Sequence, residues 1–118
     1  NAIDSIYRMF RYRDMRALDY VVHDRDWVVM RGDWGDHYEI SSYDFYDMMQ
    51  DLIYGSNTHT FVIRSVERCG YDARVFADHT YRDSWGYTRV VRLEFVLSPG
   101  GERGTYYFIR EFSSSLGR

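Results

Sequence analysis

Three side chains in the second half of the chain can exchange protons near neutral pH: His59, Asp78 and His79. A histidine with its ordinary pKa near 6.5 can accept or donate a proton at pH 7. A carboxylate among apolar and aromatic groups has a raised pKa, which suits a general base or a neutral hydrogen-bond donor. These residues predict acid–base chemistry on a small molecule. The alternative for His59 is a surface position or a satisfied place in the core.

Asp78 and His79 compete for the interior, because neighbouring side chains of a strand point to opposite faces. We favour Asp78 as the inward residue. Phe76, two residues earlier, points the same way. The alternative is that Asp78 forms an ion pair with an arginine such as Arg64 or Arg92.

An apolar wall would surround these groups and suit a hydrophobic ligand. The predicted wall consists of Trp27, Val29, Phe61, Phe76, Leu93, Phe95 and Tyr106. The chain has twelve tyrosines. A tyrosine near Asp78 is therefore no evidence for an oxyanion hole.

Metal and covalent chemistry find little support in the sequence. The four histidines show no His-x3-His spacing, and the acidic stretch 24–36 lacks the Asp-x-Asp-x-Asp-Gly pattern of a calcium loop. We therefore predict neither a metal nor a cofactor. No serine hydrolase elbow or glycine-rich phosphate loop is present. Cys69 stands alone in a predicted turn and is interpreted as a bystander.

The composition is that of one soluble globular domain spanning residues 1–118. Of the 118 residues 45% are hydrophobic and 28% charged, and the net charge is -3. That charge argues against a nucleic-acid partner. No apolar run is long enough to span a membrane. A single cysteine and no signal peptide at the start favour a cytoplasmic location.

The periodicity predicts helices at one end of the chain and strands at the other. Helices are expected near 3–10, 14–24 and 41–55, with Asp14 and Ser41 as N-caps. Strands are expected at 27–30, 58–68, 72–82, 87–97 and 105–112, with a break at 32–36 that leaves His37 in a loop. The clearest alternation places Val91, Leu93, Phe95 and Leu97 on a covered face.

This distribution of elements predicts an α+β fold, in which three N-terminal helices pack on one face of a mainly antiparallel sheet. A strongly curved sheet closed over by helices makes a cone with an apolar pocket, and such a pocket suits a small ligand.

Three stretches resemble the nuclear-transport-factor-2-like superfamily, which includes ketosteroid isomerases, scytalone dehydratase, limonene epoxide hydrolase and SnoaL-like cyclases. Residues 14–30 resemble its second helix and first strand. Gly-Tyr-Asp-Ala-Arg-Val at 70–75 is similar to its Gly-Asp-x-Ala-x-Val turn, and Ile-Arg-Glu-Phe at 109–112 resembles its closing strand. The superfamily holds many functions, so the resemblance implies the fold rather than a reaction.

The resemblance also implies roles for two residues. Asp78 lies at the spacing of the catalytic aspartate of limonene epoxide hydrolase, and His59 lies near a pocket histidine of scytalone dehydratase. However, the partner arginine of the epoxide hydrolase would fall at Phe76, and its tyrosine and asparagine would fall at Trp27 and Val29. These departures disfavour epoxide hydrolysis.

The leading hypothesis is therefore a small-molecule enzyme of the isomerase, dehydratase or cyclase type, with Asp78 and His59 as catalytic residues. The alternative is a ligand- or protein-binding module without chemistry. An engineered scaffold is a third hypothesis, because all 15 basic residues are arginine and none is lysine. A homodimer through the outer sheet face is also predicted, since Val62, Val66 and Val90 lie there among arginines.

Overall fold

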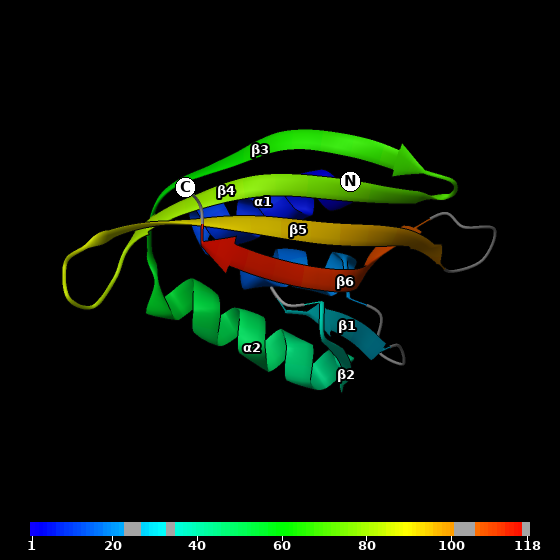
Figure 1. The fold of residues 1–118 in the computed structure, drawn as a ribbon, viewed down its shortest axis with the longest axis horizontal. Helices are drawn as coiled ribbons and strands as arrows, with labels where there is room; N and C mark the ends of the chain where they lie inside the picture. Colours follow the sequence, from blue (N-terminus) through cyan, green and yellow to red (C-terminus); the bar gives the residue numbers. More distant parts are fainter. Residues whose placement is uncertain (23–26, 33–34, 101–105, 117–118) are drawn as a thin grey trace.

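The computed structural model describes residues 1–22, 27–32, 35–100 and 106–116. The helical elements are α1 (Ala2–Tyr12), the 3-10 helix η1 (Met15–Tyr20) and α2 (Ser42–Gly55). The strands are β1 (Trp27–Arg31), β2 (His37–Ser41), β3 (Asn57–Cys69), β4 (Asp72–Arg82), β5 (Thr88–Gly100) and β6 (Tyr106–Leu116). Figure 1 shows the four long strands side by side in front of α1.

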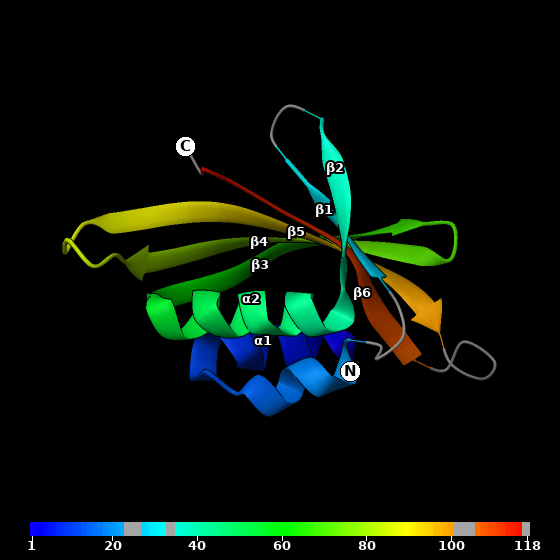
Figure 2. The same cartoon turned by 90° about the horizontal axis from the view of Figure 1, so that it is seen from below.

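All six strands form one sheet in the order β2-β1-β6-β5-β4-β3. Neighbouring strands are antiparallel except β1 and β6, which run parallel. The sheet is curled but not closed, so β2 and β3 are its two edges. Figure 2 shows that α1, η1 and α2 lie on the same face of the sheet. The α+β class is therefore confirmed.

Side chains of the expected kind cap both α-helices. The backbone N–H of Asp4 donates to Oδ1 of Asn1 over 2.8 Å, and that of Asp44 donates to Oγ of Ser41 over 3.1 Å. Each bond satisfies a donor that the first helical turn leaves free. Ser41 is thus the N-cap that the sequence predicts. In the described part of the chain, no helix is long and apolar enough to cross a membrane.

The helix predicted at 14–24 is instead the short 3-10 helix η1. Arg13, which precedes it, adopts a left-handed conformation with φ of 55° and reverses the chain after α1. Asp14 makes no side-chain cap there. The apolar residues Met15, Leu18 and Val21 are buried as expected. The prediction of three N-terminal helices is not confirmed, because only α1 and α2 are α-helical among the described residues.

The core lies between the helical layer and the inner face of the sheet. The predicted alternation of β5 is confirmed, since Leu93, Phe95 and Leu97 are buried and Val91 is half-buried on that face. In β4 the same face carries Ala73, Val75, Ala77 and His79, all buried. The helices contribute the buried side chains of Ile6, Met9, Phe10, Leu18, Phe45, Met49 and Ile53.

Aromatic rings fill the middle of this core, where a cone-shaped fold would hold its pocket. The ring of Phe10 in α1 stacks on Phe61 in β3, with 4.6 Å between centroids. Phe10 also meets Phe95 edge-on, and Phe95 lies 5.1 Å from Phe112. The predicted cone with an open apolar pocket is not confirmed, because the sheet stays open and these side chains pack against one another.

Three strand boundaries differ from the expectation. His37 was expected in a loop but begins β2, which pairs with β1. Strand β5 continues through residues 98–100, where a turn was expected, and β6 continues into the stretch expected to be a polar tail. In each case a neighbouring strand supplies the hydrogen bonds that carry the segment on.

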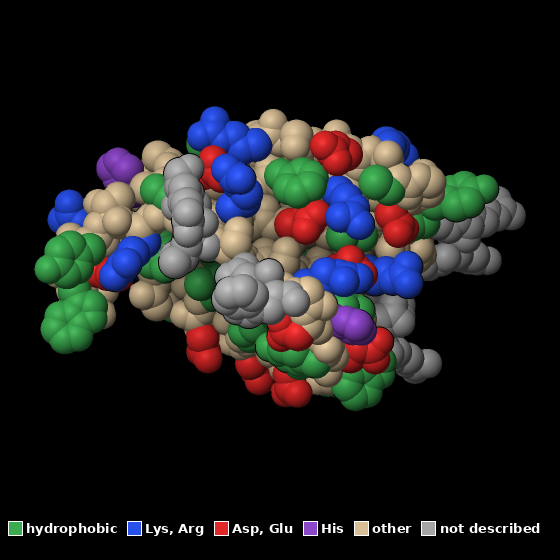
Figure 3. Space-filling model, in the orientation of Figure 1, with side chains coloured by type: hydrophobic (Ala, Val, Ile, Leu, Met, Phe, Trp, Pro, Cys, Tyr) green, Lys and Arg blue, Asp and Glu red, His purple; other side chains and the backbone are tan. Residues whose placement is uncertain are grey.

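Arginines and carboxylates interleave on the outer face of the sheet, which Figure 3 shows. Nη1 of Arg74 lies 2.9 Å from Oε1 of Glu94, and Arg31 donates two hydrogen bonds to Glu111. The bonds from Arg31 hold the pKa of Glu111 below its usual value. These pairs cross from one strand to the next, so they stabilise neighbouring strands modestly.

Two of the three valines expected on the outer face lie there. Val62 pairs with Asp78 and Val90 pairs with Thr80, and all four share the outer face. Val66 instead pairs with Val75, an inner-face residue, because a bulge at Arg64 shifts the register of β3. The prediction for Val66 was therefore wrong.

The homodimer through the outer sheet face stays a prediction, now resting on the exposed Val62 and Val90. We expect sedimentation at micromolar concentration to give twice the 14.2 kDa mass of one chain. Val62→Asp should shift the protein towards the monomer, because it adds a charge to the centre of a buried interface. A single species of one-chain mass for the unmodified protein would contradict the prediction.

Candidate functional site

Asp78 lies on the outer face of β4, not in the interior. Nε of Arg64 donates to its Oδ2 over 2.7 Å, and Nε of Arg92 lies 3.6 Å from its Oδ1. The expectation that Asp78 faces the interior was wrong, and the alternative ion pair with Arg64 and Arg92 is the one present. The inner face of β4 instead carries His79.

The predicted apolar wall divides between the two faces of the sheet. Phe61, Leu93 and Phe95 are buried in the core as expected. Phe76 is half-buried on the outer face beside Asp78. Since these residues are not on one surface, they do not form one pocket.

The strand β1 shows the same division. Val28 and Met30 are buried, so Trp27 and Val29 point to the other side, and Trp27 is 60% exposed. Tyr106 is also exposed and lines a hollow beside Asn1 and Ser5 at the start of α1. The expected ligand contacts of Trp27, Val29 and Tyr106 therefore lie outside the core.

A polar pocket of about 270 Å³ lies where β3 begins and β4 ends. It is lined by Asn57, Thr58, His59, Tyr81, Arg82 and Thr88. The register explains the grouping, because Asn57 and Thr88 both pair with Arg82, and Thr58 pairs with Tyr81. His59 is the one predicted catalytic residue that the structure places in this pocket.

A β-bulge positions His59. Thr58 pairs with Tyr81 and Thr60 pairs with Thr80, so His59 is the extra residue with no partner across the strand. Bulges commonly redirect a side chain next to a functional site. Here the bulge leaves the imidazole of His59 exposed at the rim of the pocket.

A buried histidine stands behind the pocket. His79 is 1% exposed, and its Nε2 shares a hydrogen bond of 2.8 Å with Oγ1 of Thr58, which lines the pocket. The rings of Phe10 and Tyr81 lie 5.0 Å from its imidazole. Burial lowers the pKa of His79 to about 4, so its ring is neutral at pH 7.

Arg82 is the only arginine among the described residues that line the pocket, and none of those residues is an acid. Among the described residues Arg82 has no ion pair. The arginines Arg31, Arg64, Arg74 and Arg92, also in the sheet, each face a carboxylate. The pocket therefore combines an unpaired guanidinium with neutral hydrogen-bond donors.

Hydrogen bonds connect the residue before β3, Ser56, to the ends of both α-helices. Ser56, between α2 and β3, is buried and donates from Oγ to the carbonyl of Leu52 over 2.7 Å. Arg13, at the end of α1, donates from Nη2 to the carbonyl of Ser56 over 2.9 Å. These bonds fix the start of β3, and with it Asn57 and Thr58.

The described residues contain no group of three or more histidine, cysteine or acidic side chains placed to hold a metal ion. The acidic residues at 24, 26 and 33 lie outside the described residues. Cys69 is exposed at the far end of β3 and forms no disulfide with a described residue.

No family model matches the sequence, and no curated protein matches it. Solved structures do resemble the fold. A DUF4783 family protein from Bacteroides uniformis has a TM-score of 0.74 at 8% identity, over 100% of this chain and 99% of that chain. A ketosteroid isomerase-like protein from Catenulispora acidiphila, in complex with trimethylamine, has a TM-score of 0.68 at 12% identity, over 99% and 85%.

A third structure decides the fold. It is a nuclear-transport-factor-2-like protein of unknown function from Silicibacter pomeroyi, with a TM-score of 0.61 at 14% identity, over 98% of this chain and 90% of that chain. This chain has the nuclear-transport-factor-2-like fold. The resemblance seen in the sequence is thus confirmed at the level of the fold, and the site must be argued from this chain's own residues.

Of the pocket residues, sequence reasoning found His59 and missed Thr58 and Arg82. It named His79, which lies behind the pocket, but favoured Asp78 for the interior. One signal was available for His79. Residues 73, 75 and 77 are all small or apolar, which marks their face of β4 as the inner one and places His79 with them. Nothing in the sequence marks the bulge or the unpaired state of Arg82.

We expect Asp78→Asn to lower the free energy of unfolding by about 1 kcal/mol, because ion pairs with exposed arginines are individually weak. The measurement is urea unfolding at low salt and at 1 M salt, with Asp47→Asn on the exposed side of α2 as the control. The loss should shrink at high salt. Unchanged stability at both salt concentrations would contradict a structural role for Asp78.

We expect the buried His79 to make stability fall as the pH is lowered. The unfolded chain takes up a proton near pH 6.5, while the folded chain resists it down to about pH 4. The preferential protonation of His79 in the unfolded chain should therefore lower the free energy of unfolding by about 2 kcal/mol between pH 7 and pH 5. Urea unfolding at both pH values tests this, comparing His79→Gln with His59→Gln. If the loss persists in His79→Gln and disappears in His59→Gln, the assignment is wrong.

Proposed function

We propose that this domain binds a small anionic molecule, such as a carboxylate, in the pocket between the start of β3 and the end of β4. The observation that carries the proposal is that, among the described residues, the guanidinium of Arg82 has no ion pair and no acid lines its pocket. A guanidinium presents two parallel N–H donors that match the two oxygens of a carboxylate. The pocket is smaller than most drug-sized sites, which favours a small ligand.

The remaining lining residues supply donors of the right kind. Asn57 offers an amide, and Thr58, Tyr81 and Thr88 offer hydroxyl groups. Since no described lining residue is an acid, an anion meets no like charge from them. A ligand that fills the pocket would therefore accept hydrogen bonds from these groups.

The pair of Thr58 and His79 supports the same ligand. When neutral His79 donates from Nε2 to Oγ1 of Thr58, the hydroxyl hydrogen of Thr58 is free to point into the pocket. Two hydrogen bonds in line polarise each other, which strengthens donation to an anion. Phe10 and Tyr81 hold the imidazole in place.

Catalysis of the isomerase, dehydratase or cyclase type is the second candidate, and the position of His59 favours it. An imidazole at a pocket rim can transfer protons near neutral pH. Its expected partner Asp78 does not line the pocket, however, and the pKa of His79 near 4 makes His79 a weak base at pH 7. Binding is therefore the better supported function.

The similar protein from Catenulispora acidiphila is in complex with trimethylamine, which is a cation at neutral pH. A cation of that kind would be repelled by Arg82 in this chain. Trimethylamine therefore serves as the negative control ligand.

We expect nuclear magnetic resonance titration with sodium acetate and sodium phosphate to shift the backbone signals of Thr58, Arg82 and Thr88. Arg82→Gln should weaken binding at least about tenfold, because it removes a charge-assisted hydrogen bond. Arg68→Gln, at the opposite end of β3, makes the same charge change and should leave affinity unchanged. Equal binding of trimethylamine, or unchanged affinity in Arg82→Gln, would contradict the proposal.

A further inference from the structure

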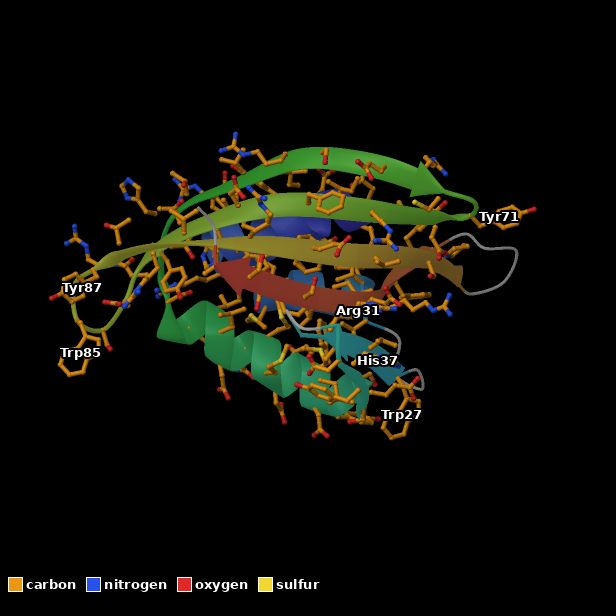
Figure 4. The ribbon with its side chains drawn as sticks, viewed as in Figure 1. Trp27, Arg31, His37, Tyr71, Trp85 and Tyr87 are labelled. Carbon is orange, nitrogen blue, oxygen red and sulfur yellow. The ribbon has the colours of Figure 1, made fainter. Side chains whose placement is uncertain are left out.

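The turn between β4 and β5, next to the pocket, has two large aromatic side chains that are exposed to solvent. Strand β4 ends at Arg82 and β5 begins at Thr88, so residues 83–87 form the turn between two pocket residues. Trp85 is 82% exposed and Tyr87 is 66% exposed. Figure 4 shows both rings at one end of the molecule, opposite Tyr71.

The carboxylate of Asp83 stabilises this turn by accepting hydrogen bonds within it; the turn stabilised in this way is called the braced turn below. Its Oδ1 accepts hydrogen bonds from the backbone N–H groups of Trp85 and Tyr87, each 2.9 Å long. Its Oδ2 accepts from Nε of Arg89 over 2.9 Å. The bond from Arg89 and the two backbone donors lower the pKa of Asp83 below its usual value. Gly86 completes the turn with φ of 84°, a conformation that suits glycine.

The hydrogen bonds to Asp83 fix the backbone of the turn, so little backbone conformational entropy is lost there when a ligand binds. Exposed tryptophan and tyrosine side chains offer a flat apolar face together with a polar edge. Figure 3 shows hydrophobic side chains at this end of the molecule close to arginine and histidine side chains. The turn and the pocket are therefore continuous through Arg82 and Thr88, which pair with each other.

A ligand that uses both parts must combine three properties. It needs a negative charge for Arg82, several hydroxyl or carbonyl groups for the donors of the pocket, and an apolar face for an aromatic ring. A simple aromatic acid lacks the hydroxyl groups, and a neutral sugar lacks the charge. An acidic sugar has all three, because the C–H groups of a pyranose form an apolar face and its carboxylate stands at one edge.

We propose that the pocket and the braced turn form one site for a hexuronate, the six-carbon sugar acid. The carboxylate pairs with Arg82, the ring hydroxyls meet Asn57 and Thr88, and the C–H face of the sugar lies on Trp85 or Tyr87. This inference rests on the proposed binding of an anion in the same pocket, and it adds the chemical class of the ligand.

The test is a titration with sodium glucuronate, glucose and sodium acetate, followed by nuclear magnetic resonance. The unmodified protein should bind glucuronate more tightly than acetate, and glucose weakest of all. The indole N–H signal that disappears in Trp85→Ala identifies Trp85, and glucuronate should shift that signal while acetate should not. A short oligouronate that binds more tightly than glucuronate would identify a polysaccharide end as the source.

The double variant Trp85→Ala/Tyr87→Ala should weaken glucuronate binding about tenfold and leave acetate binding unchanged. Both rings are exposed, so the fold should survive, which circular dichroism checks. Tyr71→Ala, which removes an exposed ring from the opposite hairpin, should change neither affinity.

The two proposals fail in different ways. If acetate does not bind, the proposed anion pocket is wrong, and the sugar site fails with it. If acetate binds through Arg82 but the double variant binds glucuronate as tightly as the unmodified protein, only the sugar site is overturned. Glucose binding as tight as glucuronate binding would also overturn the assignment to an acidic sugar.

Discussion

The packing of α1 against the inner face of the sheet, through the ring of Phe10, is the contact on which the rest of the structure depends. This ring stacks on Phe61, meets Phe95 edge-on and lies against His79, so one side chain joins β3, β4 and β5 to the helical layer. Deleting a buried phenylalanine typically costs about 3–5 kcal/mol, which is a large part of the stability of a small domain. Because this space is filled, the proposed ligand site lies at the surface, where β3 begins and β4 ends.

The filled core also decides the electrostatics. Charged side chains cannot enter it without partners, so the arginines of β3, β4 and β5 lie on the outer face or at the ends of the strands. On the outer face several arginines meet a carboxylate of a neighbouring strand, as Arg74 meets Glu94. The last pair of β4 and β5 joins Arg82 to Thr88 instead. The charge of Arg82 stays uncompensated within the described residues, because its neighbour across the strand is a hydroxyl.

Local sequence patterns predicted most of the fold. The prediction of the site was wrong at Asp78, where the resemblance to a known enzyme was given more weight than the alternation along β4. The alternation of β5 placed Leu93 and Phe95 correctly, since a buried face needs apolar residues at every second position. The same rule applied to Ala73, Val75 and Ala77 places His79 inside, whereas Phe76 and the resemblance to limonene epoxide hydrolase placed Asp78 there. The extension of β5 through Pro99 could not be foreseen. Beyond Leu97 this strand pairs with β6 alone, so its other side is open to a residue without an N–H.

The bulge at His59 is the step that no sequence rule supplied, because it results from how the start of β3 is held. Arg13 and Ser56 fix the chain before β3, while the packing of Phe61 against Phe10 fixes the register after it. Between these two constraints the strand contains one residue more than its partner, and the extra residue is pushed outward. The same constraints hold Thr58 against His79 on the inner side. The position of the pocket at the surface is thus a consequence of the core packing, because the helices that cover the interior also fix the residues at its edge.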